Sequence, residues 1–185
     1  ATRETLRSNH LNRAFSSSYT GPDGKELCAT NHIRENGTVY SNELTNAADL
    51  SMTSLEQAEI DFSDIRDGGG KRVQVEPRYL VVSKENRFNA HRLLKSQYDP
   101  ENDSNAVNPQ ADVGLEPCVW NYLTDTDAWF LFADKSEHRL CVYEREAPWS
   151  DYDFDFNTKD YRFSLMFAES SGWADPRGIF GSPGV

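Results

Sequence analysis

The sequence predicts a fold of the α+β class, and three patterns lead to this prediction. Aromatic residues alternate with charged or small residues over 151–156 and again over 161–168, which is the period-two pattern of long β-strands. Apolar residues spaced three and four positions apart over 55–65 indicate an amphipathic helix. Three shorter strand-like runs, separated by polar turns, lie between these regions within 118–145.

The N-terminal part is expected to begin with helix and to continue in irregular structure. Residues 1–15 place several apolar side chains on one helical face, as at the end of an amphipathic helix. The run Gly21-Pro22-Asp23-Gly24 predicts a tight turn, because Pro presets one backbone angle and Gly permits positive φ. Asn36-Gly37 then predicts a hairpin turn.

Two helices and one buried strand are expected between residues 51 and 96. A T-x-x-E capping box of Thr53 and Glu56 begins the first helix, and the glycine run 68–70 ends it. Tyr79-Leu80-Val81-Val82 reads as a buried strand, after which Ser83 is expected to cap the second helix. The buried stripe of the first helix is Leu55, Ala58, Phe62 and Ile65, and that of the second is Phe88, Ala90, His91 and Leu94.

The second half of the chain is expected to be rich in strands. Residues 97–116 have no regular pattern and predict a long loop. The runs 118–123, 128–133 and 139–145 are joined by short turns, which predicts a β-meander. In the long strands that follow, one face is aromatic, and we expect that face to be buried.

The C-terminal tail, residues 172–185, carries large apolar side chains among glycines and prolines. Exposure of Trp173, Ile179 or Phe180 to water costs roughly 1.5–3 kcal/mol for each side chain. The tail is therefore expected to dock on its own subunit or on a neighbouring one.

Composition and charge exclude several classes of protein. The net charge is −11 and no basic run is present, which argues against a sequence-reading nucleic-acid binder. Aromatic residues make up 12% of the chain, too many for a disordered protein, whereas only 37% of residues are hydrophobic. A polar, aromatic-rich chain can cover its apolar faces with copies of itself.

Neither a membrane protein nor a disulfide-linked one is predicted. No apolar run approaches the length needed to cross a bilayer, and no signal peptide is recognisable. Cys28, Cys118 and Cys141 are an odd, scattered set, typical of buried thiols in a reducing compartment. We therefore expect a soluble intracellular protein.

Three patterns resemble ligand sites only in part. Asp151, Asp153 and Asp155 have the spacing of a calcium loop, but Phe156 and Arg162 replace its glycine and its glutamate, so a solvated strand face is favoured. The glycine run lacks the spacing of a phosphate-binding loop. Cys28 and His32 lie four residues apart and could contribute to a zinc site or a thiol–imidazole pair, but no second close pair completes four ligands. No catalytic, cofactor-binding or metal-ligating residue is assigned.

Several short blocks resemble the major capsid (head) proteins of tailed bacteriophages. They are GPDGKELC at 21–28 followed by His32, DLS at 49–51, LTDTDAWFLFA at 123–133 and GWADPRG at 172–178. Their order along the chain also matches that family. The resemblance implies the tailed-phage major capsid fold, which encapsulins share, with a peripheral domain that has a spine helix and long β-strands, plus an axial domain.

By this analogy residues 1–50 contain the end of the spine helix and a peripheral loop, 51–138 form the axial domain, and 139–185 form the peripheral strands and tail. The resemblance implies self-assembly into hexamers and pentamers of an icosahedral shell around phage dsDNA, without sequence-specific contact to the DNA. Portal, scaffold or decoration proteins are possible partners. The product would be a virion component assembled in the host cytoplasm, with no enzymatic activity, cofactor, metal or membrane.

Two features of the family are not recognisable, namely its N-terminal arm and its extended hairpin loop. We therefore expect this chain to be the C-terminal portion of a longer protein. A Lys–Asn cross-linking motif cannot be matched either, and none is assigned. Two alternatives stay open at this point: an encapsulin-like cellular compartment, and a hydrolase that uses Cys28 and His32.

Overall fold

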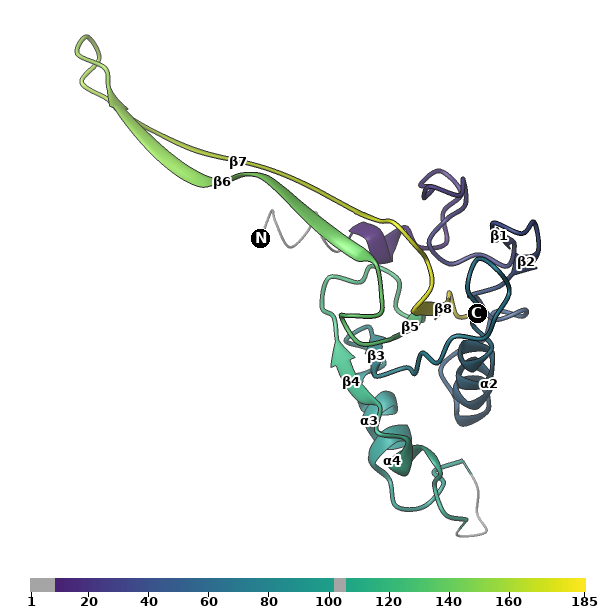
Figure 1. The fold of residues 1–185 in the computed structure, drawn as a ribbon. Coiled ribbons are helices and arrows are strands. Elements are labelled where there is room, and N and C mark those ends of the chain that lie inside the picture. Colours follow the sequence, from purple (N-terminus) through teal and green to yellow (C-terminus); the bar gives the residue numbers. More distant parts are fainter. Residues whose placement is uncertain (1–8, 102–105) are drawn as a thin grey trace.

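The computed structural model describes residues 9–101 and 106–185, and it consists of a mixed helix-and-strand body with a long two-stranded ribbon (Figure 1). The elements are β1 (His32–Ile33), β2 (Val39–Tyr40), α2 (Met52–Ser63), β3 (Tyr79–Val82), α3 (Arg87–Lys95), α4 (Gln110–Val113), β4 (Glu116–Val119), β5 (Trp129–Phe132), β6 (Leu140–Phe154), β7 (Tyr161–Trp173) and β8 (Ile179–Ser182). Residues 9–12 are helical as well. Of the rest of the predicted N-terminal helix, residues 13–15 form a turn, and residues 1–8 lie outside the described residues.

The central sheet has the strand order β4-β3-β5-β8. Strand β3 pairs in parallel with β4 and antiparallel with β5, and β5 pairs antiparallel with β8. The predicted β-meander is therefore wrong: β4 and β5 are not neighbours, and β6 leaves the sheet to pair with β7. All four residues of β5 are apolar and buried, because their side chains pack on both faces of the sheet, and β3 and β8 pair with the two edges of this strand.

The core lies on both faces of the sheet. Trp129 and Leu131 point to the face covered by α2 and α3, whereas Phe130 and Phe132 point to the other. The second face is covered by the N-terminal segment, which contributes Leu27 and other residues. The apolar core of the body thus includes segments from the start, the middle and the end of the chain.

The C-terminal tail is an integral strand of this core. The tail was predicted to dock on its own subunit or on a neighbouring one. Ile179 is fully buried and Phe180 is 1% exposed within this chain, so the tail docks on its own subunit. Gly181 lies against Phe130, because a Cβ atom at Gly181 would lie 2.7 Å from Cδ1 of the Phe130 ring. Only glycine allows this strand to approach β5 so closely.

Helix α2 begins two residues earlier than the sequence suggested. Its N-cap is Ser51, and the capping box consists of Ser51 and Ser54, so the assignment to Thr53 and Glu56 is wrong. The hydroxyl of Ser54 also donates to a backbone carbonyl, which holds it at the helix start. The helix ends at Ser63, before the glycine run.

All four residues of the predicted apolar stripe of α2 are buried. Leu55, Ala58 and Phe62 lie within the helix, and Ile65 packs just beyond its end. The glycine run forms a turn in which Gly70 has a φ of +87° and its N–H donates to the carbonyl of Asp67. The hairpin turn at Asn36-Gly37 is confirmed, because it joins the antiparallel strands β1 and β2.

Helix α3 begins at Arg87, three residues after its predicted start. The hydroxyl of Ser83 accepts a bond from the backbone N–H of Asn86 and donates to the carbonyl of Thr126, so it lies in the turn before the helix. The inner face consists of Ala90, Leu93 and Leu94. Phe88 and His91 were expected on that face, but both are exposed.

The stretch 97–116 has more structure than a loop. It contains the short helix α4 and the start of β4, and Tyr98 pairs with Val107 in an isolated bridge. The buried side chain of Asn108 donates to the carbonyls of Leu93 and Ser96, which ties this stretch to the end of α3.

Candidate functional surface

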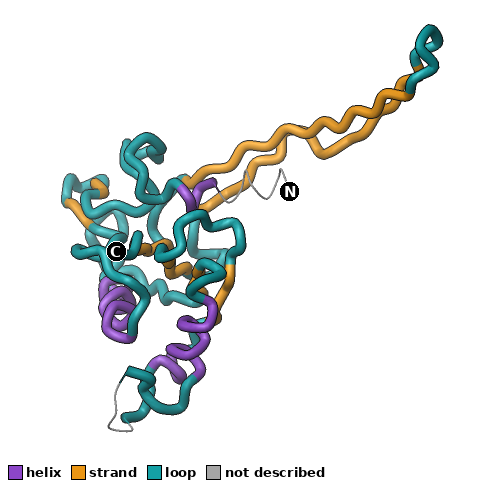
Figure 2. The backbone as a smooth tube through the Cα atoms, turned by 180° about the vertical axis from the view of Figure 1, so that it is seen from behind, coloured by secondary structure: helices purple, strands orange, loops and turns teal. Residues whose placement is uncertain are grey.

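The two-stranded ribbon of β6 and β7 projects away from the body (Figures 1 and 2). The strands pair antiparallel from Leu140↔Trp173 at the base to Phe154↔Tyr161 near the tip. Strand β6 has 15 residues, so it spans roughly 50 Å at about 3.4 Å per residue. All of the outer half is exposed, so the expectation that one face is buried is wrong within this chain.

The register gives the ribbon two different faces, because directly opposite residues in an antiparallel pair lie on the same face. Tyr152 lies opposite Phe163, and Phe154 lies opposite Tyr161. We define the aromatic face as Tyr152, Phe154, Tyr161, Phe163 and Leu165. Phe163 is 81% exposed and Tyr152 is 72% exposed.

The opposite face of the same segment is polar. Asp153 lies across from Arg162, and Asp151 lies across from Ser164. The carboxylates of Asp151 and Asp153 each accept a hydrogen bond from the N–H of the following residue. The outer ribbon is therefore amphipathic, with aromatic rings on one side and carboxylates on the other.

Such a ribbon is poorly stabilised by itself. An isolated two-stranded hairpin is marginal in water, and each large apolar side chain left exposed forfeits roughly 1.5–3 kcal/mol of burial. Contiguous exposed apolar patches on soluble proteins mark interaction surfaces. The aromatic face consequently has the properties of a surface that another protein covers.

The tip of the ribbon is a well-bonded turn. The carboxylate of Asp155 accepts hydrogen bonds from the backbone N–H groups of Asn157 and Thr158, and it forms an ion pair with Arg162 at 3.1 Å. Lys159 has a φ of +63°, and its Nζ lies 3.8 Å from the centroid of the Phe156 ring. Asp155 thus stabilises the turn.

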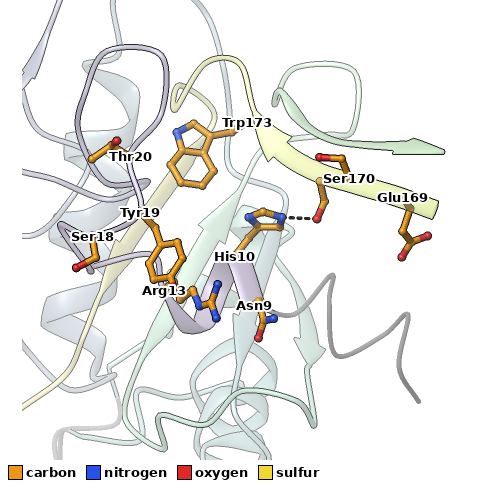
Figure 3. A pocket seen from close by; sticks show the side chains of 10 residues that line it. Asn9, His10, Arg13, Ser18, Tyr19, Thr20, Glu169, Ser170 and Trp173 are labelled. Atoms are coloured by element: carbon orange, nitrogen blue, oxygen red, sulfur yellow. Dashed lines mark hydrogen bonds between the residues drawn. The ribbon is translucent and has the colours of Figure 1, made fainter. Parts of the chain in front are cut away.

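The base of the ribbon borders a cleft of about 560 Å³ (Figure 3). His10, from the N-terminal helical segment, points at β7, where its Nε2 lies 2.6 Å from the hydroxyl oxygen of Ser171. The His10 ring also meets the Trp173 ring edge to face, with centroids 5.9 Å apart. Trp173 in turn packs against Gly21. These contacts join the ribbon to the N-terminal segment.

The cleft changes the protonation of His10, and this gives a testable prediction. Burial lowers the pKa of His10, and the nearby Arg13 guanidinium lowers it further. The unfolded chain therefore binds a proton at His10 more readily than the folded chain does. The stability contributed by the neutral ring is present above the ordinary pKa of histidine, and it is lost as the pH falls towards the lowered pKa of the folded protein. We expect an NMR titration to give a midpoint for His10 below the ordinary 6.5.

The control for this titration is Arg13→Gln, which removes the smaller cause of the lowered pKa, the nearby positive charge, and leaves the larger cause, the burial of the ring. The midpoint of His10 should then rise only part of the way to the ordinary value. A wild-type midpoint at or above that value would contradict the packing described here.

The candidate pair of Cys28 and His32 does not form a nucleophilic site. His32 is fully buried; its Nδ1 lies 2.5 Å from a carboxylate oxygen of Asp23, and its Nε2 lies 3.0 Å from the amide oxygen of Asn42. Both ring nitrogens therefore have partners other than the thiol. Burial raises the pKa of the Cys28 thiol well above its usual range, with further contributions from two nearby glutamates. These conditions oppose formation of a thiolate.

Asn42 is a buried polar residue that the sequence reading missed. Its amide nitrogen donates to the carbonyls of Leu27 and Ile179, and its amide oxygen accepts from the N–H of Ala29 at 2.8 Å. Together with His32, these bonds link the N-terminal segment to strand β8. A lone asparagine in an irregular stretch gives no periodic signal, so only the folded structure identifies it.

No metal centre is found in the part of the chain that the structure describes: no three or more His, Cys, Asp or Glu side chains are grouped to hold an ion. Of the three aspartates with calcium-loop spacing, Asp151 and Asp153 bond to adjacent backbone and Asp155 bonds to the turn. Within the same described residues, no helix is both long and apolar enough to cross a membrane.

Comparison with solved structures gives a match to the crystal structure of a phage-related protein from Bordetella bronchiseptica RB50. The two are 13% identical, with a TM-score of 0.47, over 71% of this chain and 48% of that one. This chain thus spans about half the length of that protein. No curated protein matches.

A family model described as phage capsid protein matches residues 6–181, which is nearly the whole chain. The matched region contains the complete ribbon and nearly all of the body. Membership in such a family indicates a structural role in the phage capsid. On this match, the chain belongs to the phage capsid protein family.

Proposed function

We propose that this chain is part of a major capsid protein whose copies self-assemble into the icosahedral head shell of a tailed phage. The observation that carries the proposal is the aromatic face of the ribbon, which is exposed over the outer half of β6 and β7. The match to a phage capsid family supports the proposal that further copies of the chain cover this face. The proposal includes the tailed-phage major capsid fold.

Weak contacts are sufficient to hold together a shell that is built from many copies. In a closed symmetric assembly each contact is repeated in every subunit, and a subunit held by several contacts dissociates only when all of them open. The hexamers and pentamers of a capsid lattice would thus be held together by modest interfaces. An amphipathic ribbon that extends well beyond its own body is suited to reach a neighbouring subunit.

The proposed content of the shell is phage dsDNA. With a net charge of −11, the subunit provides little general attraction for phosphates, so the DNA would be enclosed without sequence-specific contact. Portal, scaffold and decoration proteins are proposed partners, and assembly is proposed to occur in the host cytoplasm.

The division into 1–50, 51–138 and 139–185 stays a prediction. Strand β8, from the third part, completes a sheet whose other strands come from the second. If the division applies, the tail joins the peripheral part to the axial part, together with the N-terminal segment that packs on the same sheet.

We expect Phe163→Asp to reduce the yield of assembled particles strongly. The substitution places a carboxylate in the middle of the aromatic face, opposite Tyr152, where contact with a neighbour would bury it unpaired. The measurement is particle yield by electron microscopy and sedimentation. Ile60→Asp is the matched control, because Ile60 is a 61% exposed apolar residue on α2, away from the ribbon.

Equal particle yields from the two variants would refute the role of the ribbon. A purified protein that never assembles would refute self-assembly itself. Particles that contain no phage dsDNA would favour a cellular compartment over a phage head.

A further inference from the structure

The strand register separates the charges of the outer ribbon from its rings. Asp151, Asp153 and Arg162 all lie on the face opposite to the aromatic face. Along the paired strands the aromatic face therefore carries no charged side chain. A surface that covers this face gains nothing from opposite charges, and any polar group that it placed there would be buried without a partner. The partner surface has to be apolar as well.

The described part of the body, residues 9–101 and 106–139 with 174–185, offers no apolar face of similar extent. Its helices and strands expose large apolar side chains only singly or in pairs. Ile60 on α2 and Phe88 on α3 are single, and Ile33 lies opposite Val39 on the hairpin of β1 and β2. The aromatic face has five such side chains in register on two neighbouring strands. Among the described surfaces, the one that matches it in length and character is the same face of another copy.

We propose that the aromatic faces of two ribbons, one from each of two copies, stack on each other around a two-fold axis. Sheets that pack face to face lie about 10 Å apart, and the side chains of the two inner faces interdigitate. The rings can then take the offset and edge-to-face arrangements that aromatic pairs prefer. This inference rests on the proposed self-assembly and names a surface by which two copies meet.

The area of the two faces is sufficient for a specific contact. The exposed fractions of the five side chains run from 42% to 81%. At roughly 150–250 Å² for each aromatic side chain, the stack would remove about 1,200 Å² from water in total. Stable, specific interfaces bury about 1,200–2,000 Å², so the stack reaches the lower end of that range. A contact of this size is modest, and repetition throughout a shell makes it effective.

The two ribbons have to run in opposite directions. Each projects from one side of a body that is much wider than the ribbon (Figures 1 and 2). Because the stacked layers are only about 10 Å apart, two bodies at the same end would collide. With the bodies at opposite ends, the inner parts of the two ribbons separate them.

This direction determines which residues meet. Three cross-strand pairs follow one another on this side of the ribbon, from tip to base: Phe154↔Tyr161, Tyr152↔Phe163 and Ser150↔Leu165. When the axis passes through the middle pair, Tyr152 and Phe163 contact the same two residues of the second copy. The tip pair of each copy lies over the base pair of the other.

The polar faces stay in water and limit the stack to two ribbons. Asp151 and Asp153 of both copies lie on the two outer sides of the sandwich, away from the contact. A third ribbon would have to pack against these carboxylates, where it would find like charges or leave them unpaired. The contact therefore closes with two copies and does not extend into a fibre.

Opposite charges at one position test the two-fold contact in the full chain. Phe163→Asp and Phe163→Lys should each lower particle yield by about tenfold or more, because position 163 meets its own copy and like charges repel. Co-expression of the two variants should recover much of the yield, since each charge can then face its opposite. Ile60→Asp with Ile60→Lys is the matched control, with little change expected alone or together. Circular dichroism checks that each variant is folded.

A cross-link identifies the covered face without relying on charge. Tyr152 and Asp153 are adjacent and both exposed, but they lie on opposite faces of the ribbon. A short bismaleimide should therefore link Tyr152→Cys into covalent dimers severalfold more efficiently than Asp153→Cys. Wild-type protein gives the background from Cys118 and Cys141, which are partly exposed. Equal linkage of the two variants would overturn the stack.

The outcomes separate this inference from the proposed function. If wild type forms particles but co-expression yields no more than either charged variant alone, another surface covers the ribbon; stacking is then overturned while self-assembly stands. If wild type forms no particles and Tyr152→Cys gives no dimers above background, both are overturned. Efficient dimers of Tyr152→Cys without any particles would support the stack and refute the shell.

Discussion

Trp129→Ala will lower the free energy of unfolding by about 3–5 kcal/mol, which is the usual cost of deleting a large buried aromatic side chain. Trp129 is fully buried in the central strand β5 and packs against the cluster that α2 and α3 contribute. Its indole N–H also donates to the carbonyl of Ala48 at 3.0 Å, and the deletion removes this hydrogen bond, leaving the Ser182 hydroxyl as the donor to that carbonyl.

The measurement is urea denaturation of the unassembled subunit, with Trp149→Ala as the matched control. Trp149 lies on β6 and is 42% exposed, so the same substitution there should change the unfolding free energy by only about 0.5 kcal/mol. If the two variants were equally destabilised, β5 would not be the centre of the core. The pair also tests whether the body folds independently of the ribbon.

The core strands β3 and β5 could be predicted from the sequence, but their neighbours could not, and β8 was predicted only as a docking tail. Uninterrupted apolar runs identified β3 and β5, because a strand that is buried on both faces has no polar alternation. Periodicity reports which side chains share a face and says nothing about which strand lies alongside. The parallel pairing of β3 with β4, and the insertion of β8 beside β5, follow from long-range packing.

For the candidate surface too, periodicity predicted which side chains share a face but not what lies against that face. Alternation over 151–168 predicted two long strands with one aromatic face, and β6 and β7 have that arrangement. The burial of that face was predicted wrongly within this chain, because alternation shows which side chains share a face but not whether any other part of the protein covers it. A similar limit applies to α3, where apolar spacing placed Phe88 inside, whereas Leu93 and Leu94 fill the core and leave Phe88 outside.

Local polar chemistry was the least predictable part. Thr53 and Glu56 satisfy the capping-box pattern, but Ser51 and Ser54 form the box, because a serine at the third helical position can bond back as well. Asn42 gave no signal at all. Its role depends on carbonyl groups far apart in the chain, which come together only after the sheet has formed.

Asn42→Leu will also be strongly destabilising, although leucine is apolar and has the same number of side-chain heavy atoms and the same branching. The substitution removes the donor to the carbonyls of Leu27 and Ile179 and the acceptor for the N–H of Ala29 and the ring of His32. Each buried group left unpaired costs about 1–3 kcal/mol, and the bonds are shared in one network. We expect a loss of about 3 kcal/mol or more in the free energy of unfolding.

Asn46→Leu is the matched control, because Asn46 is exposed four residues further along the same irregular stretch. Its effect on unfolding should be near zero. Hydrogen exchange locates the damage: the amides of Ala29 and β8 should exchange faster in Asn42→Leu, whereas those of the outer β6–β7 ribbon should not change. Equal exchange in all three segments would mean that Asn42 does not hold the tail strand. Selective loss at Ala29 and β8 would show that one buried amide couples the N-terminal segment to the last strand of the sheet.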